Sequence, residues 1–277
     1  MSKIVYSLDH VSVSLNADQN KLALKDISIE IEQSEQIAVI GKSGAGKTTF
    51  LETLALANLP VSGQLKIWGD FPWRLSDLVR HKLRASLFLT PQHPPLPPRQ
   101  RVITTVLAGC LPQWSLWKAL CSLFHPKDSA LAYSALKPFA IEDKIFTRVD
   151  RLSGGERQRV SLARMFASNA NILLVDEPLS ALDPALSSTV LNAILQEAKK
   201  RNATLICSLH QTELACSAFP RIIGLLDGKL LFDLPKAEVT QDLIALLYQQ
   251  TPAQDVDALI GFDISQPKLA HLDGNLC

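Results

Sequence analysis

The chain has 277 residues, of which 47% are hydrophobic and 20% charged, and its formal net charge at neutral pH is +1. This length suits one large domain with its own core, and the balanced charge provides no broad field that would attract nucleic acid or an anionic membrane. The five cysteines form neither a C-x-x-C pair nor the His/Cys spacing of a zinc site, so we expect reduced thiols in the cytosol.

The most apolar segment, residues 102–128, is where a membrane span would be sought. Pro112, Gln113 and Lys118 interrupt it, so it falls short of the roughly 18–20 uninterrupted apolar residues that a spanning helix requires. The first fifteen residues alternate like a strand and lack the continuous apolar region of a signal peptide. We therefore expect neither a transmembrane segment nor a secretion signal.

Two strands are predicted early in the chain. In residues 22–32, Ile27, Ile29 and Ile31 share one face and polar residues occupy the other, a period of two that predicts a half-buried antiparallel strand. The short apolar run "QIAVI" at 36–40 predicts a strand that is covered on both faces.

The segment "GKSGAGKTT" lies between the 36–40 strand and a predicted helix that begins near Phe50, the strand–loop–helix setting of a phosphate-binding loop. Its glycines let backbone N–H groups surround a polyphosphate without obstruction by a Cβ atom. Lys47 is placed to bridge the β- and γ-phosphates, and the Thr48 hydroxyl to ligate Mg²⁺. We expect the phosphates to be bound by Gly41, Lys42, Ser43, Gly44, Ala45, Gly46, Lys47, Thr48 and Thr49.

Residues 93–168 show little strand pattern and predict a helical subdomain inserted into an α/β core. The stretch "PQHPPLPPR" at 91–99 carries five prolines and predicts an extended, stiff connector, with a surface loop that has no partner as the alternative. A helical apolar stripe is also predicted, mostly packed in the core and partly available to a partner protein. Its members are Trp114, Trp117, Leu120 and Phe124.

Two further apolar runs, residues 171–176 and 203–209, predict buried strands on either side of a helix. Asp183 can cap that helix, and Pro184 suits its first turn. The order strand, helix, strand indicates a parallel sheet with right-handed crossovers.

An acidic pair ends the first of these strands. Asp176 occupies the position at which a P-loop protein holds Mg²⁺ through water. Glu177 would face the attacking water and act as a general base. A purely structural pair of acids is the alternative.

A second glycine pair lies in "LSGGERQR", residues 152–159, where a predicted helix begins. The helix start offers free N–H groups and a serine hydroxyl to a phosphate. One nucleotide does not need two such sites in one chain, so the second is expected to contact the γ-phosphate of a nucleotide held by another subunit. The residues concerned are Leu152, Ser153, Gly154, Gly155 and Glu156.

With these motifs the sequence resembles the ATP-binding-cassette (ABC) ATPases over about residues 3–245. The resemblance implies an α/β fold of the P-loop NTPase class, with a RecA-like core, an N-terminal antiparallel β subdomain and an inserted helical ABC subdomain. Together these form an ABC ATPase domain over residues 1–250, with the helical subdomain at about 93–168. Residues 251–277 form a tail to which no role is assigned.

The resemblance further implies ATP and Mg²⁺ as cofactors and a homodimer of ATPase subunits. This homodimer would bind transmembrane permease subunits at the cytoplasmic face of the inner membrane, as a peripheral protein. A periplasmic substrate-binding protein would be an indirect partner, and nucleic acid would not be a partner.

Individual roles also follow from the resemblance. Gln92, in "TPQHP", is similar to the glutamine that joins the core to the helical subdomain and senses Mg²⁺ and the γ-phosphate. Asp183, in "SALD", resembles the acid that communicates across the dimer interface, and His210, in "CSLHQ", resembles the switch histidine that contacts the γ-phosphate. The implied catalytic residues are Glu177, His210 and Gln92, and the implied Mg²⁺ ligands are Thr48, Gln92 and Asp176.

Two positions depart from the family pattern. Leu15 stands where many members carry an aromatic side chain that stacks on adenine, and leucine offers apolar contact without a π face. Ser34 replaces a glycine that is usual at a tight turn, which we expect to be a modest local change.

Among ABC ATPases, the resemblance extends to the ATP-binding subunits of phosphonate importers, through "VLAG…W…L…F", "VDRLSGGERQRVSLAR", "SLHQTELA" and "RIIGLLDGKLLFD". It implies import of phosphonates or related organophosphorus anions, although the proline-rich connector differs from the usual sequence of these importers. Amino acids or other small solutes are the alternative cargo. A soluble ABC protein of DNA repair or translation is a further alternative, but the sequence shows no second cassette. A P-loop kinase is another alternative, and the "LSGGERQR" motif argues against it.

Overall fold

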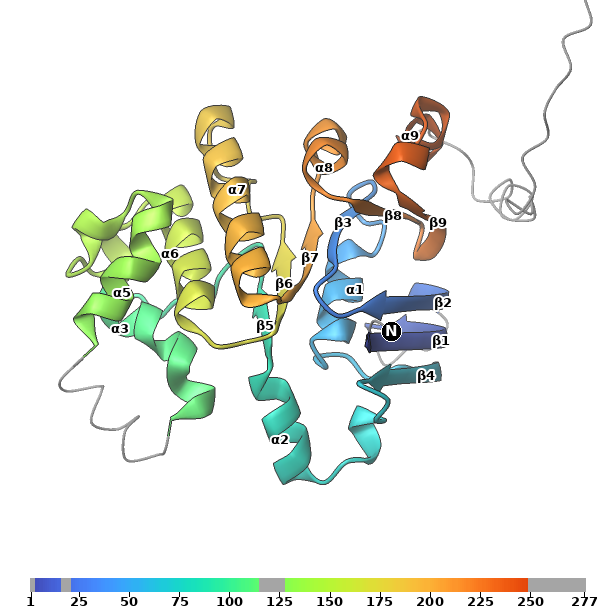
Figure 1. Ribbon diagram of the computed structural model, residues 1–277, viewed down its shortest axis with the longest axis horizontal. Helices are drawn as coiled ribbons and strands as arrows, with labels where there is room; N and C mark the ends of the chain where they lie inside the picture. Colours follow the sequence, from blue (N-terminus) through green and yellow to red (C-terminus); the bar gives the residue numbers. More distant parts are fainter. Residues whose placement is uncertain (1–2, 16–20, 115–127, 249–277) are drawn as a thin grey trace, which may run out of the picture.

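The computed structural model describes residues 3–15, 21–114 and 128–248 (Figure 1). The tail at 251–277 and three members of the expected apolar stripe, Trp117, Leu120 and Phe124, lie outside the described residues. Trp114 is described. It has extended backbone after the 3₁₀ helix η2 (Ala108–Gln113) and packs half-buried against the core, so the prediction of a helical stripe is wrong at its first member.

The first layer is an antiparallel sheet with the order β2–β1–β4. The predicted 22–32 strand is confirmed as β2 (Leu22–Glu32), which pairs with β1 (Ile4–Ser14), and β4 (Ser62–Ile67) pairs with the other edge of β1. Ile27 and Ile31 are fully buried, while the polar residues between them face outward, as the period of two requires.

The second layer is a six-stranded sheet with the order β5–β6–β7–β3–β8–β9, in which only β9 runs antiparallel to its neighbour. The predicted strand at 36–40 is confirmed, and those at 171–176 and 203–209 are confirmed within one residue of each end. The strands are β3 (Gln36–Ile40), β5 (Leu87–Thr90), β6 (Ile172–Asp176), β7 (Thr204–Ser208), β8 (Arg221–Leu226) and β9 (Lys229–Pro235).

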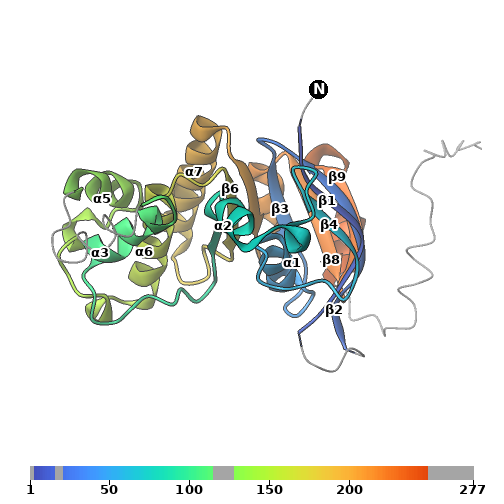
Figure 2. The same cartoon turned by 90° about the horizontal axis from the view of Figure 1, so that it is seen from below.

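Alternate residues of the central strands belong to two separate cores. On β3, Ile37 and Val39 pack with α1 (Lys47–Leu54) and the antiparallel sheet, whereas Ala38 and Ile40 pack on the opposite side. Successive side chains of a strand point to opposite faces, so a short continuous apolar run is needed when both faces are covered. Helix α1 therefore lies between the two sheets (Figure 2).

Buried contacts fix the position of α1. The hydroxyl of the fully buried Tyr6 on β1 donates a hydrogen bond to the carbonyl of Leu54 at the end of α1, at 2.9 Å. The helix begins at Lys47, three residues before the start expected from sequence. It directly follows the phosphate-binding loop that leaves β3.

The remaining helices surround the second core. Helix α7 (Pro184–Arg201) covers the other face of the six-stranded sheet, and α8 (Thr212–Ala218) packs near β3. Helix α2 (Asp77–Ala85) precedes β5, and α9 (Gln241–Tyr248) contacts β8. Asp183 caps α7 by accepting a hydrogen bond from the N–H of Leu186 at 2.9 Å, which confirms the predicted helix start.

Helices α3 (Val102–Leu107), α5 (Ser129–Leu136) and α6 (Gly154–Ala167) pack on one another at the end of the molecule far from β1, β2 and β4 (Figure 1). Residues 91–100 link β5 to α3 without a helix or strand, as their prolines predict. No helix in the described ranges is both long and apolar enough to cross a bilayer.

Candidate functional site

The predicted site residues meet at one edge of the six-stranded sheet, because the parallel strands β3, β5, β6 and β7 all end there. The phosphate-binding loop follows β3, Gln92 follows β5, the acidic pair ends β6, and His210 follows β7. Ligands of open α/β sheets bind at the carboxyl ends of the strands, so this edge is the expected position for a site.

The phosphate-binding loop directs its lysine inward. Lys47 is 4% exposed, and its Nζ donates hydrogen bonds to the carbonyls of Gly41 at 2.9 Å and Lys42 at 3.0 Å. Burial lowers the pKa of Lys47, and the nearby carboxylates of Glu177 and Asp176 oppose that shift. Gly46 has φ +101°, and a Cβ there would come within 2.9 Å of the Ala23 carbonyl, so the residue before α1 must be glycine.

Asp176, at the end of β6, connects the phosphate-binding loop to the end of β7. The Thr48 hydroxyl donates to Asp176 Oδ2 at 2.8 Å, and the Ser208 hydroxyl donates to Asp176 Oδ1 at 2.6 Å. Asp176 is only 2% exposed, so both carboxylate oxygens depend on these hydroxyl partners. A buried carboxylate beside a hydroxyl offers hard oxygen donors, the type of ligand that Mg²⁺ prefers.

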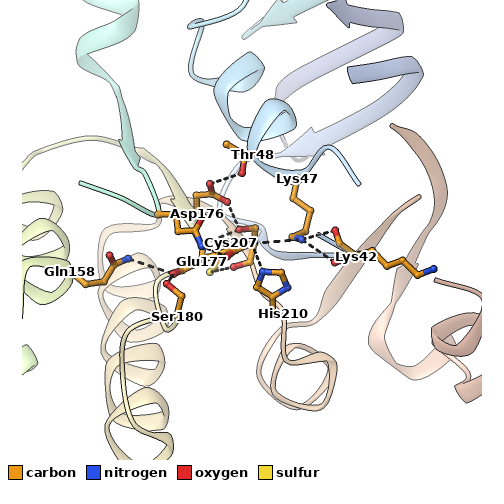
Figure 3. Close-up of polar contacts among 12 residues, drawn as sticks. Lys42, Lys47, Thr48, Gln158, Asp176, Glu177, Ser180, Cys207 and His210 are labelled. Carbon is orange, nitrogen blue, oxygen red and sulfur yellow. Dashed lines mark hydrogen bonds and ion pairs between the residues drawn. The ribbon is translucent and has the colours of Figure 1, made fainter. Parts of the chain in front are cut away.

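Three side chains from three other segments contact Glu177, and Figure 3 shows two of them, Lys47 and His210. The Gln92 amide donates to Oε2 at 2.7 Å, His210 Nε2 lies 2.6 Å from Oε1, and Lys47 Nζ lies 3.7 Å from Oε1. The residue is 7% exposed, whereas the His210 side chain is 46% exposed. The carboxylate thus lies between the loop lysine and a partly accessible histidine.

A cavity of about 760 Å³ opens beside these groups. One part of its lining belongs to the loop, with Ser43, Lys47 and Thr48, and Gln92, Glu177 and His210 line it next to them. The lining continues past the loop to Leu15 and the first residues of β2. The volume and the chemistry suit a ligand that has several phosphates at one end.

None of the "LSGGERQR" residues lines this cavity, although the Gln158 amide of this motif lies 3.5 Å from the Glu177 carbonyl. Ser153 caps α6 by accepting a hydrogen bond from Glu156 N–H at 3.2 Å, and the Glu156 carboxylate accepts one from Ser153 N–H at 2.7 Å. Ser153 and Gly154 are exposed and absent from the cavity lining. Within one copy of the chain, therefore, the two glycine-rich motifs do not meet.

Three residues of the site were not found by sequence analysis. Ser208 donates to Asp176 and accepts the N–H of Glu177 at 2.9 Å. Gln158 and Ser180 both donate to the Glu177 carbonyl, at 3.5 and 3.1 Å. Only Ser208 had a signal in the sequence: it is a small hydroxyl residue at the last position of the buried strand β7, two residues before His210.

Fold and site together define a P-loop nucleotide-hydrolysing protein: a parallel sheet, a glycine-rich loop leading into a helix between two layers, and a buried acidic pair beside the loop lysine. Comparison with known proteins narrows this class. The family model for ABC transporters matches residues 24–180.

Curated relatives agree with the family model. The phosphonates import ATP-binding protein PhnC 2 of Albidiferax ferrireducens is 55% identical over 228 residues, which cover 82% of each chain. PhnC of Pseudomonas fluorescens is 47% identical over 242 residues, covering 86% of this chain and 91% of the relative.

A solved structure agrees as well. The dimeric post-hydrolysis state of an ATP-binding cassette with bound ADP and Pi has a TM-score of 0.71 at 25% identity, covering 83% of this chain and 98% of that one. The chain belongs to the ABC transporter family, as a nucleotide-binding ATPase subunit.

Proposed function

We propose that this chain is the ATP-hydrolysing subunit of an ABC importer for phosphonates or related organophosphorus anions. The relatives named as phosphonates import ATP-binding proteins support the cargo, since they match over most of their length. The observation that carries the hydrolytic part is the position of Glu177, between Lys47 and His210 at the edge of the cavity.

The loop residues Gly41–Thr49 would bind the phosphates. Backbone N–H groups at the start of α1 and the helix dipole favour the negative charge there. Lys47 would leave the carbonyls of Gly41 and Lys42 and contact the phosphate oxygens, a charged partner that suits a buried ammonium better than a neutral carbonyl.

Mg²⁺ fits the residues present. The Thr48 hydroxyl and the Asp176 carboxylate are adjacent oxygen donors, and the carbonyl oxygen of Gln92 would supply a third protein ligand. Among residues 3–15, 21–114 and 128–248, no group of three His, Cys, Asp or Glu side chains could hold a metal, so the remaining ligands would be phosphate oxygens and water. When bound, the ion would neutralise charge on the phosphates.

Glu177 would act as the general base. Lys47 and the Gln92 amide would turn to the nucleotide, which frees the carboxylate to accept a proton from water. His210 Nε2 lies 2.6 Å from Glu177 Oε1 in the structure. With nucleotide bound, His210 would contact the γ-phosphate and hold the attacking water beside Glu177. Proton transfer to such a positioned general base contributes about 10²–10⁴-fold to a reaction rate.

A second copy of the chain would complete the site. Leu152–Glu156 of one copy would contact the γ-phosphate held by the other, and Asp183 would communicate across the interface. Gly154 supports this arrangement, because a Cβ at this exposed position would contact nothing within 4 Å in its own chain. By contrast, a Cβ on Gly155 would lie 2.7 Å from the Ala181 carbonyl, so packing within the chain explains that glycine.

Residues 93–168 would act as the helical subdomain that transmits closure of the dimer to the permease subunits. The ATPase would then be a peripheral protein at the cytoplasmic face of the inner membrane, with the periplasmic binding protein as an indirect partner. Nucleic acid is not expected to bind, because the net charge of +1 supplies no broad attraction.

Steady-state ATP hydrolysis tests the catalytic assignment. Glu177→Gln preserves the shape of the side chain but removes the base, so we expect turnover to fall about 10²–10⁴-fold with ATP affinity retained. Lys47→Ala is the matched variant for nucleotide binding, and it should lose affinity for ATP instead. Unchanged turnover in Glu177→Gln would remove Glu177 from this role.

Growth of a strain that lacks this gene, with a phosphonate as the sole phosphorus source, tests the cargo. We expect no growth in a strain that has no second phosphonate importer. Normal growth would contradict the cargo and leave the ATPase assignment intact, with amino acids or another small solute as the alternative.

A further inference from the structure

Helix α2 lies on the outside of the molecule, at the edge opposite α8 and α9 in Figure 1 and nearest the viewer in Figure 2. None of its nine residues is buried, although Leu83 packs partly against the core. On the outer side of the helix, Leu78 is 68% exposed and Val79 46% exposed. Packing within the chain therefore does not account for the two aliphatic side chains.

The net charge of +1 conceals a local excess of positive charge around α2. Residues 64–85 carry five Lys or Arg and two Asp, an excess of three positive charges, so the rest of the chain has a net charge of −2. The charged residues of this segment are Lys66, Asp70, Arg74, Asp77, Arg80, Lys82 and Arg84. Of the five cations, Arg80 alone has a carboxylate partner, Asp77, within the described ranges. The positive charge of the chain is thus concentrated beside the exposed aliphatic residues.

Two aromatic rings hold three of the arginines in place. The Arg74 guanidinium lies 4.4 Å from the centre of the Phe71 ring. Those of Arg80 and Arg84 lie 5.9 and 6.0 Å from the centre of the Trp73 ring. A stacked guanidinium still presents N–H donors to an anion, and its phosphate contacts can be bidentate. Because the rings already order these side chains, less conformational freedom is lost when they bind a partner.

An anionic lipid surface matches both features of this region. Its phosphate groups are partners for arginine and lysine, and the boundary of its acyl chains accepts aliphatic side chains such as Leu78 and Val79. The phosphate backbone of a nucleic acid matches the cations but offers no apolar layer to the two aliphatic residues. Charge and apolar exposure together therefore favour a bilayer.

Resting on the peripheral placement proposed above, we propose that α2 and the preceding turn bind the anionic phospholipid headgroups of the membrane. We call this contact region the α2 surface, and it consists of Arg74, Leu78, Val79, Lys82 and Arg84. The contact holds the ATPase at the bilayer independently of the permease. Its three cations are exposed, and together they favour an anionic over a neutral lipid surface by about 10²-fold.

The first test measures sedimentation of the full-length chain with lipid vesicles, without nucleotide and without permease. We expect about 10²-fold tighter binding to vesicles of phosphatidylglycerol and phosphatidylcholine than to vesicles of phosphatidylcholine alone. Added salt should weaken the binding, because it screens exposed charges. No binding, or equal binding to both vesicles, overturns the proposal. This result does not depend on ATP hydrolysis, so it leaves the assignment of Glu177 as the general base to its own test.

The second test removes charge from the α2 surface. Arg74→Gln combined with Lys82→Gln should weaken binding to the anionic vesicles by about thirtyfold. The matched control is Lys199→Gln combined with Lys200→Gln, which removes two exposed cations from the end of α7 and should change the affinity much less. An equal loss in both pairs would show that net charge alone drives the binding, and would overturn the proposal.

The third test examines the apolar contact. Leu78→Gln should weaken binding by about fivefold and leave its salt dependence unchanged, because it removes an aliphatic group and no charge. Leu131→Gln, at an exposed leucine of α5, should bind like the wild type. Unchanged binding in Leu78→Gln would contradict the contact with the acyl boundary.

An acidic segment of the permease is the alternative occupant of the α2 surface. Neutral vesicles that contain the permease distinguish the two. If the chain binds these vesicles but not permease-free anionic ones, and the Arg74→Gln, Lys82→Gln pair weakens that binding, the occupant is the permease and the lipid proposal is overturned.

Discussion

Glu177 has φ +46°, a left-handed backbone conformation that residues with a Cβ rarely adopt. Such a conformation costs about 1–3 kcal/mol and persists only where the surroundings enforce it. Here the Ser208 hydroxyl accepts the Glu177 N–H, and Gln158 and Ser180 donate to its carbonyl, so both backbone groups are fixed. The strain is therefore located at the residue proposed as the general base.

Ser208 is consequently predicted to position both acids. Ser208→Ala leaves the Glu177 N–H buried without its partner and removes a donor from Asp176. We expect a loss of about 1–3 kcal/mol in the free energy of unfolding. We also expect turnover to fall more than ATP affinity, because the phosphate-binding loop is untouched. Denaturant unfolding and the separate kcat and KM values measure this, and Ser208→Thr should restore part of the turnover.

At the residue scale, sequence predicted several of the side chains that meet beside the cavity, but not the residues that hold them in place. The acidic pair, the loop lysine and His210 are recognisable because each follows a strand and carries a reactive group. Ser208 and Gln158 act through contacts that span 32 and 19 residues along the chain, and no local pattern encodes such distances.

At the scale of the elements, the starts of α1 and α7 lie next to the candidate site, and sequence predicted only one of them correctly. Sequence placed the start of α7 correctly, because Asp183 caps it through a local hydrogen bond. It placed the start of α1 too late. The helix begins at Lys47 because Gly46 ends the loop with a positive φ, and Gly46 packs closely against Ala23 of β2. Local capping can be predicted from sequence, whereas contact between layers cannot.

The capping box at the start of α6 allows a test that separates stability from function. Ser153→Ala removes the cap and should lower the free energy of unfolding by about 1 kcal/mol. If Ser153 also contacts a nucleotide on another copy, ATP turnover should fall by much more than this loss of stability explains. Thr240→Ala is the control: it removes the hydroxyl that accepts the Leu243 N–H at the start of α9, and turnover should be unchanged.

The same box should weaken in acid. The N–H of Ser153 donates to Glu156 and lowers the pKa of that carboxyl below its usual value of 4.5. A lowered carboxyl pKa stabilises the fold fully above the unfolded value, and this contribution is lost as the pH falls through the folded value. The stability deficit of Glu156→Gln should therefore be present at pH 7 and shrink below about pH 4.5. A deficit that does not change with pH would contradict an ionic capping box.

At the scale of the whole molecule, one copy of the chain keeps its two glycine-rich motifs apart. The phosphate-binding loop, the acids and His210 share one cavity, while Ser153 and Gly154 are exposed elsewhere on the same chain. The alternation of apolar residues predicted a strand of the antiparallel sheet, and continuous apolar runs predicted three strands of the six-stranded sheet. Neither pattern shows how far apart the two glycine-rich motifs lie in the fold. That separation is the reason for proposing that a second copy completes the site.

Sedimentation of full-length Glu177→Gln tests the dimer most directly. With ATP and Mg²⁺ we predict a species of twice the 30.4 kDa chain mass, and a single chain when ATP is omitted or when Ser153→Ala is added. One unchanged mass with and without ATP, both for the isolated chain and in the presence of its permease, would contradict the account.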